Sequence, residues 1–148
     1  MTVKINISYC DHYQGLPKPV YQTTASSGLD LLAAVREDLI IEPGAYQLVP
    51  AGIKIELPCD FEAQVRPRSG LALNHGITVL NSPGTIDADY RGEIQVLLIN
   101  FGRERFVISR GMRIAQLVIG KVTRVELLEK AVLDETIRNE GGFGHTGL

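Results

Sequence analysis

The segment with the densest chemistry runs from residue 81 to residue 93 and reads NSPGTIDADYRGE. Pro83 and Gly84 fit the central positions of a type II turn, in which glycine supplies the positive φ, so the segment predicts a hairpin. If the arm after the turn is extended, Asp87 and Asp89 share one face, because side chains two residues apart point the same way. A carboxylate beside an aromatic ring and an arginine suits activation of water next to a sugar and a phosphate. A solvated acidic turn is the competing interpretation.

A second segment reads RPRSG over residues 66–70 and lies where an apolar run ends. Ser69 could cap a following helical turn, and the backbone N–H groups at the start of such a turn are free to bind an anion. The two arginines favour a phosphate site, with a solvated turn as the alternative. No histidine lies close to Ser69 in the sequence, so we do not predict a covalent nucleophile there.

Two further polar residues lie inside apolar runs. Asp30, in the run GLDLLAA that begins at residue 28, would be costly to bury without a partner. We therefore expect either an ion pair with an arginine or a supporting role beside a metal-bound phosphate. Gln116 should face away from Ala115 and Leu117 on a strand, where a local hydrogen bond is the simplest role for it.

The end of the chain reads EGGFGHTGL, with four glycines among its nine residues. Such a composition cannot hold a stable element by itself, so residues 138–148 are expected to form a flexible glycine-rich arm. Glycine-rich loops can approach phosphates closely, but the lysine and hydroxyl residue of a P-loop are missing from this one. A disordered tail without a ligand is the alternative.

Short apolar runs must position these segments. The chain has 148 residues with 15 glycines and 7 prolines, and the dense spacing of breakers is typical of an all-β sandwich or barrel. Alternation predicts half-buried strands over residues 3–7, 53–57 and 61–65, and longer β-branched runs predict strands at 94–99, 106–108, 114–119 and 122–127. Residues 71–75 fit one helical turn, whereas 124–140 fit a helix and an edge strand equally well.

The composition limits the number of domains, the class of partner and the location of the protein. The apolar fraction is 45% and the charged fraction 22%, which fits one domain over residues 1–137 followed by the arm. The formal charge of −2 gives no bulk field for nucleic-acid binding. Cys10 and Cys59 are too few for a disulfide scaffold and lack metal-ligand spacing in the sequence, which favours a reducing, cytoplasmic location. The N-terminus does not resemble a targeting peptide, and no run predicts a membrane span.

In this order and at these spacings, the segments resemble the homotrimeric dUTP diphosphatase (dUTPase) family. The resemblance covers about residues 28–147 and rests on RSGLA from Arg68, GTIDADYRG from Gly84 and GGFG from Gly141. It implies a jelly-roll-like, distorted β-barrel of the β-clip type with one short helix. It also implies an enzyme of nucleotide metabolism: a homotrimeric hydrolase with shared active sites that uses Mg²⁺ to convert dUTP into dUMP and pyrophosphate. Such an activity limits uracil in DNA and supplies dUMP for thymidylate synthesis.

The resemblance assigns roles to the chemistry-bearing residues. Asp87 would be the general base for water attacking the α-phosphorus, with Gln116 beside that water, and Asp30 would contact Mg²⁺ through water. Tyr90 would stack under the deoxyribose and leave no room for a 2′-hydroxyl. Other substrate contacts would come from Arg68, Ser69 and Gly70 at the phosphates and from Asn81, Gly84, Thr85 and Ile86 at the uracil.

The arm would close over the bound nucleotide. The resemblance implies that Phe143 stacks on uracil, that Arg138 reaches the γ-phosphate, and that Gly144, His145 and Thr146 wrap the phosphates. Many family members have a serine where this chain has His145. A hydroxyl contact to phosphate would therefore be replaced by the imidazole or by the backbone alone. Closure would expel bulk water and strengthen the charge interactions inside.

Two alternatives remain at this point. The related dCTP deaminases share the fold and the trimer, although the hairpin and the phenylalanine of the tail match the hydrolase better. A protein of the same fold could also act as a nucleotide-sensing module without catalysis. The presence of both Asp87 and Gln116 argues against that second alternative.

Overall fold

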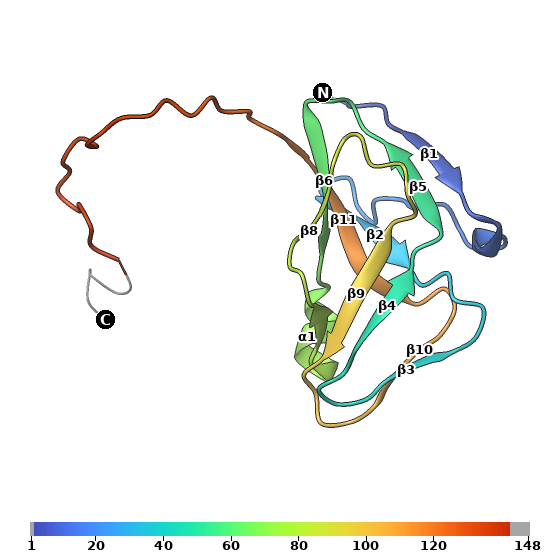
Figure 1. Ribbon diagram of the computed structural model, residues 1–148. Helices are drawn as coiled ribbons and strands as arrows, with labels where there is room; N and C mark the ends of the chain where they lie inside the picture. The colour runs from blue at the N-terminus through green and yellow to red at the C-terminus, as the bar shows by residue number, and fades with distance from the viewer. Residues whose placement is uncertain (1, 143–148) are drawn as a thin grey trace.

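Short antiparallel strands joined by turns make up almost all of the regular structure in the computed structural model, which describes residues 2–142 (Figure 1). In chain order the elements are β1 (Asn6–Tyr9), the 3₁₀ turn η1 (Asp11–Tyr13), β2 (Gly28–Leu32), β3 (Leu39–Ile41), β4 (Tyr46–Pro50), β5 (Ile53–Glu56), β6 (Phe61–Arg66), α1 (Ser69–His75), β7 (Ile77–Val79), β8 (Gly84–Ile86), β9 (Gln95–Asn100), β10 (Phe106–Ile108) and β11 (Arg113–Lys121). The expected all-β class with one short helix is confirmed.

The largest sheet has four strands in the order β2-β11-β6-β8, so β2 and β8 form its opposite edges. β11 pairs antiparallel with β2 and with β6. Within this sheet Gln116 lies opposite Asp30 on one side and opposite Arg66 on the other. The pairing therefore brings three of the chemistry-bearing segments into one row across the sheet.

The remaining strands form a three-stranded sheet, β4-β9-β7, and two strand pairs, β1-β5 and β3-β10. The arrangement is jelly-roll-like, but within residues 2–142 the four sheets do not join into one closed barrel. The alternation predicts a half-buried strand over residues 3–7. The observed strand β1 covers Asn6–Tyr9 and pairs with β5, and its Ile7 is 40% exposed. The first strand is therefore covered less than its sequence pattern suggests.

The apolar core follows from strand alternation. In β5, Ile53 and Ile55 are buried whereas Lys54 and Glu56 are exposed, as the period of two predicts. Each fully buried Ile or Leu contributes about 1.5–3 kcal/mol through loss of water contact. The largest fully buried apolar side chains are Leu31, Ile41, Val49, Ile53, Ile77, Ile94, Val96, Leu98, Ile108, Ile114 and Leu117.

One polar side chain is completely buried among the described residues. Asn100, at the end of β9, donates from Nδ2 to the carbonyls of Ile41 (2.9 Å) and Glu104 (2.8 Å) and accepts from the N–H of Gly102 (2.8 Å). Its donors and its acceptor are thus satisfied, which removes most of the cost of burial. The amide ties β9 to β3 and to the turn that leads into β10.

The helix α1 is longer than the predicted turn at 71–75, beginning at Ser69. It ends at Gly76, which has the left-handed conformation with φ of 68°. A Cβ at Gly76 would come within 2.5 Å of the N atom of Gly102. Glycine is therefore needed at this helix end both for the conformation and for the close approach of the neighbouring chain.

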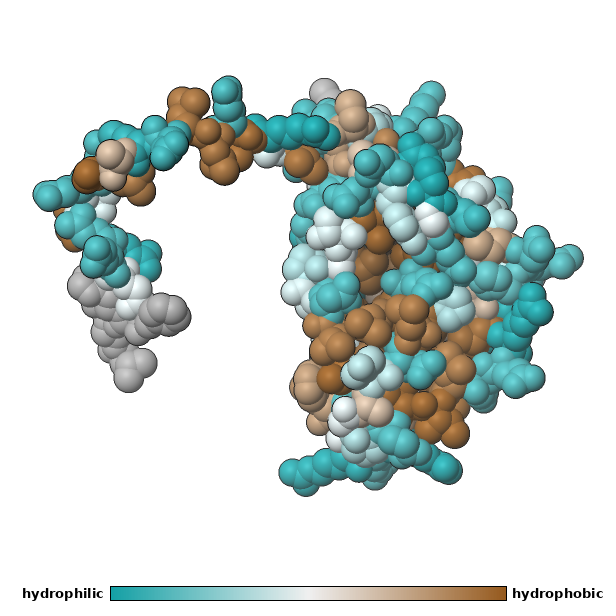
Figure 2. All heavy atoms as spheres, viewed as in Figure 1, coloured by the Kyte–Doolittle hydropathy of each residue, from teal (hydrophilic) through white to brown (hydrophobic). Residues whose placement is uncertain are grey.

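The predicted strand at 122–127 and the helix or edge strand at 124–140 are not present. After β11 the chain leaves the body and continues away from it without regular structure (Figure 1). Its apolar side chains face solvent, as the brown spheres along it show in Figure 2, and Leu127 is 91% exposed. Within residues 2–142 no strand pairs with this run, although the N–H of Val122 donates to the carbonyl of Asp60 at 2.9 Å.

Cys10 and Cys59 are both free thiols, as expected. Within residues 2–142, no helix is long and apolar enough to cross a membrane.

Candidate active site

Asp30 lies in β2 between two arginines. Its carboxylate is 3.3 Å from Nε of Arg68 and 3.5 Å from Nη1 of Arg113, and its side chain is only 15% exposed. The expected ion pair is therefore present, with two partners rather than one. Arg68 also donates to the carbonyl of Arg113 at 3.1 Å, so the three groups hold one another in place.

Gln116 lies on β11 between β2 and β6, with its side chain on the opposite face from the buried Ala115 and Leu117, as predicted. Its Nε2 donates to the carbonyl of Pro67 at 3.0 Å. Gly28 leaves the room that this side chain occupies, since a Cβ there would lie 2.5 Å from Oε1 of Gln116. Gly28 is thus a positioning residue that the sequence analysis did not single out.

The start of α1 differs from the prediction. Ser69 is the first helical residue and not the cap; the cap position is Arg68, which makes no side-chain capping bond. The guanidinium of Arg68 instead faces Asp30, and Ser69 and Gly70 remain exposed. The first turn of the helix therefore keeps uncapped N–H groups, since helix termini leave their first donors without intrahelical partners.

The turn prediction at Pro83 is also wrong. Ser82-Pro83 is a cis peptide, and Gly84 is the first residue of β8 rather than a turn residue with positive φ. A Cβ on Gly84 would meet the side-chain nitrogen of Asn81 at 3.2 Å. Asn81 and β8 are consequently packed closely, which places the amide at the start of this strand.

Asp87 follows β8 directly and is exposed. The chain turns immediately after it, with the N–H of Tyr90 donating to the carbonyl of Asp87 at 3.1 Å. Asp87 and Asp89 thus belong to a turn and not to the extended arm that the shared-face argument assumed. Among residues 2–142 the carboxylate of Asp87 takes part in no ion pair.

Two hollows flank this turn. Asp87 lines a pocket of about 490 Å³ together with Arg91 and Arg124. It also lines one of about 250 Å³ that includes Thr85, Ile86 and Tyr90. The β8 residues named by the sequence analysis therefore share a concave surface with the predicted base.

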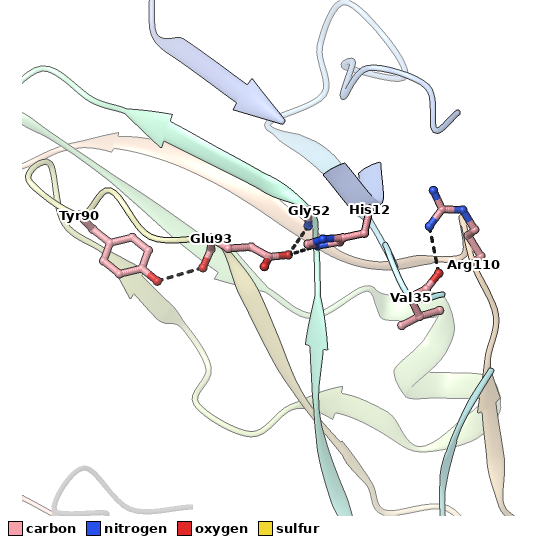
Figure 3. Close-up of polar contacts among 6 residues, drawn as sticks. All are labelled: His12, Val35, Gly52, Tyr90, Glu93 and Arg110. Carbon is pink, nitrogen blue, oxygen red and sulfur yellow. Dashed lines mark hydrogen bonds and ion pairs between the residues drawn. The ribbon is translucent and has the colours of Figure 1, made fainter. Parts of the chain in front are cut away.

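Tyr90 is held by its hydroxyl, which donates to the backbone carbonyl of Glu93 at 2.9 Å (Figure 3). A Cβ at Gly92 would lie 2.3 Å from that hydroxyl, so the glycine lets the ring fold back over the chain. The Glu93 carboxylate in turn accepts from the N–H of Gly52 at 2.8 Å and lies 2.7 Å from Nε2 of His12. Sequence reasoning missed His12 and Glu93, which are 81 positions apart.

The predicted site residues thus form two groups within one chain. Asp30, Arg68 and Gln116 gather where β2, β11 and the start of α1 meet, whereas Asp87 and Tyr90 lie beyond β8, at the opposite edge of the sheet. Neither pocket that contains Asp87 is lined by a member of the first group. Each group alone holds only part of the predicted site.

Arg138 lies on the segment that leaves the body, where its Nε donates to the carbonyl of Gly141 at 2.7 Å. It contacts neither group. Phe143, Gly144, His145 and Thr146 lie outside the described residues.

The comparisons with known proteins agree on one family. The family model for dUTPase matches residues 15–147. The chain is 54% identical over 148 residues to a deoxyuridine 5′-triphosphate nucleotidohydrolase from Thermoanaerobacter sp. (strain X514), covering all of both chains. It is 56% identical over 146 residues to the protein of the same name from Rickettsia typhi, covering 99% of this chain and 98% of the relative.

Solved structures share the fold. A dUTPase mutant of Staphylococcus bacteriophage 80alpha with dUpNHpp superposes with a TM-score of 0.88 at 20% identity, covering 99% of this chain and 100% of that one. A mutant dUTPase from phage phi11 of S. aureus, described with a structural Mg(II) ion, gives a TM-score of 0.77 at 18% identity over 88% of this chain and 98% of that one. From the family match and the full-length relatives together, the chain belongs to the dUTPase family.

Proposed function

We propose that this chain hydrolyses dUTP to dUMP and pyrophosphate by attack of water on the α-phosphorus. The observation that carries the proposal is the family match over residues 15–147. We assign the role of general base to Asp87, whose exposed carboxylate follows β8 and takes part in no ion pair among residues 2–142. A base must accept a proton in the reacting complex, so a carboxylate without a cationic partner is suited to the role.

Recognition of the nucleoside is assigned to the residues around β8. Tyr90 stacks under the deoxyribose, and its fixed hydroxyl supports this by limiting rotation of the ring. Asn81, Gly84, Thr85 and Ile86 contact the uracil, and a tight wall there excludes the methyl group of thymine by a clash. A steric clash discriminates against thymine more strongly than attraction could, because one methylene in an apolar pocket changes the binding free energy by only about 1–3 kcal/mol.

The phosphates are assigned to Arg68, Ser69, Gly70 and Gln116. The uncapped first turn of α1 and the guanidinium of Arg68 suit an anion, since both supply donors and positive potential. The carboxylate of Asp30 balances the charge of Arg68. In phosphoryl transfer the protein contributes mainly such positioning of the phosphates and neutralisation of their charge.

The residues present fit Mg²⁺ held through water. The Asp30 carboxylate is paired with two arginines, and it belongs to no group of three close metal-ligating side chains among residues 2–142. A direct all-protein cage is therefore missing there, and Asp30 would contact the hydration shell of an ion carried by the phosphates. When bound, Mg²⁺ supplies neutralisation of phosphate charge and orientation of the chain of phosphates.

The proposed assembly is a homotrimer whose active sites are shared between subunits. The separation of the two residue groups at opposite edges of one sheet supports sharing, because a partner's edge could complete each half. Unpaired apolar surface also supports association: Tyr46 and Leu48 of β4 are 63% and 50% exposed, and Figure 2 shows apolar side chains gathered on the face of the body in view.

The glycine-rich arm is proposed to close over a bound nucleotide. Arg138 would reach the γ-phosphate and Phe143 the uracil, with Gly144, His145 and Thr146 around the phosphates. Ordering such a segment costs about 1–2 kcal/mol per residue in backbone entropy, so closure should depend on the triphosphate. The resulting enzyme would limit uracil in DNA and supply dUMP in the cytoplasm.

A substrate screen tests this function. Purified protein with Mg²⁺ is incubated separately with dUTP, dTTP, dCTP and UTP, and the products are identified. Release of pyrophosphate and dUMP from dUTP alone is expected. Ammonia from dCTP would indicate a deaminase instead, and nucleotide binding without any product would indicate a sensing module.

A further inference from the structure

A cysteine, a histidine and a glutamate converge beside the candidate active site. Glu93 lines the same hollow as Asp87 and Tyr90, but none of the three has a role in the proposed hydrolysis. Cys10 follows β1, His12 lies in η1, and Glu93 precedes β9. A ligand atom of each lies within 4.8 Å of the ligand atoms of the other two, and all three residues are partly buried. These are the only three such residues that gather in this way within the part of the chain described.

Backbone hydrogen bonds hold the three segments in register. The N–H of Cys10 donates to the carbonyl of Gly52 at 2.9 Å, and the N–H of Tyr13 donates to the carbonyl of Cys10 at 2.8 Å. Gly52 also donates its N–H to Oε1 of Glu93 at 2.8 Å. Figure 3 shows His12 and Gly52 meeting the same carboxylate from two separate segments. The cluster is therefore preorganised by the fold and not by the side chains alone.

The three ligand types suit a zinc-class ion. Thiolate, imidazole and carboxylate are the usual zinc ligands, and three protein ligands leave a fourth tetrahedral position open. Bonds of about 2.0–2.3 Å put tetrahedral ligand atoms roughly 3.5 Å apart. Nε2 of His12 and Oε1 of Glu93 are 2.7 Å apart and would separate slightly, and no pair of ligand atoms is more than 4.8 Å apart. Mg²⁺ prefers oxygen ligands and octahedral geometry, so this set would discriminate against it.

We propose that Cys10, His12 and Glu93 bind one divalent transition-metal ion of the zinc class, with water in the open position. The side chains of His12 and Glu93 are 22% and 18% exposed, which leaves a path for an ion while removing most bulk water. Cys10 also lines a hollow of about 480 Å³ with Tyr9 and Tyr13. The site rests on these side chains and not on dUTP hydrolysis, so either proposal can fail without the other.

Metal binding at this site must release a proton. Burial and the nearby carboxylate of Glu93 raise the pKa of the Cys10 thiol, with Asp11 acting in the same direction and Lys54 against it. The free thiol is therefore protonated near neutral pH, and binding replaces its proton by the metal ion. Affinity should accordingly rise with pH, by up to about tenfold per pH unit for one displaced proton.

The test uses the full chain, stripped with a chelator and titrated with Co²⁺ in excess Mg²⁺. One Co²⁺ per chain is expected, with tetrahedral visible absorption, a thiolate-to-cobalt charge-transfer band, release of one proton, and displacement by Zn²⁺. Cys10→Ser should remove the charge-transfer band. His12→Ala should weaken binding at least about 100-fold while the band stays, since even residues outside the first ligand shell cost 10–100-fold.

The matched control is Cys59→Ser, which removes the exposed second thiol and should leave uptake and spectrum unchanged. Absence of stoichiometric uptake by the unaltered chain would overturn the proposal, as would a band that survives Cys10→Ser or disappears with Cys59→Ser. Circular dichroism of each variant establishes that it is folded. Should Cys10→Ser not fold, the spectrum and proton release of the unaltered chain decide alone.

Discussion

The two edges of the four-stranded sheet treat their polar groups in opposite ways. At the β2 edge, Asp30 is paired with Arg68 and Arg113, and Gln116 is bonded to a backbone carbonyl. Beyond the β8 edge, Asp87 is exposed and takes part in no ion pair among the described residues. At the β2 edge the charge of Asp30 is balanced by arginines that can also bind a phosphate. Beyond the β8 edge the carboxylate of Asp87 is accessible to a substrate.

The largest effect is expected from removing that free carboxylate. Asp87→Asn should lower turnover of dUTP by about 10²–10⁴-fold, the usual contribution of a general base. The affinity for dUTP should stay within about tenfold, or roughly 1.4 kcal/mol. Steady-state kinetics and calorimetric binding measure the two quantities. Asp89→Asn, in the same turn, is the control and should remain close to the unaltered enzyme; equal losses in both variants would remove Asp87 as the base.

Deletion of residues 138–148 is the next largest change. It leaves both sheet edges intact but removes the donors proposed to close over the phosphates, so hydrolysis should fall by about 10²-fold. The mass of the proposed trimer, measured by light scattering, should not change. Full activity of the shortened chain would show that the two edges need no closing arm.

At the β2 edge the sharpest substitution is Gly28→Ala. The added Cβ would lie 2.5 Å from Oε1 of Gln116, so the flexible amide must move while the fold need not. Turnover should drop by about tenfold, whereas the free energy of unfolding should change by less than about 1 kcal/mol. Gly120→Ala on β11 is the control, because its Cβ would meet Glu62 only at 3.9 Å. Equal turnover in the two variants would show that the position of Gln116 does not matter.

The smallest effect concerns the hydroxyl of Tyr90. Tyr90→Phe removes one partly exposed hydrogen bond to Glu93, worth about 0.5–1 kcal/mol, so kcat/KM for dUTP should stay within roughly fivefold. Tyr90→Ala should instead reduce the preference for dUTP over UTP, because the ring face excludes the 2′-hydroxyl. If the ratio of kcat/KM for the two nucleotides is the same in both variants, the ring is not the discriminating group.

Local sequence patterns were reliable where one segment decides its own conformation. The alternation at 53–57 and 61–65 matches β5 and β6 because a half-buried strand needs a period of two. The run at 122–127 has the composition of a strand, yet no strand in the described part of the chain pairs with it. The capping prediction failed at Ser69 because Arg68 takes the cap position and turns its side chain toward Asp30.

The amino-acid sequence by itself determined the all-β class, the need of Asp30 for a partner, and the segments that resemble a dUTPase. Those features depend on residue types and short spacings. Only the tertiary structure decided which arginines pair with Asp30, that Asp87 lies beyond the opposite edge, and that Cys10 and His12 meet Glu93. The pairing of β2 with β11 brings the side chains of Asp30 and Arg113, 83 positions apart, within 3.5 Å, and no short-range pattern encodes which strands become neighbours.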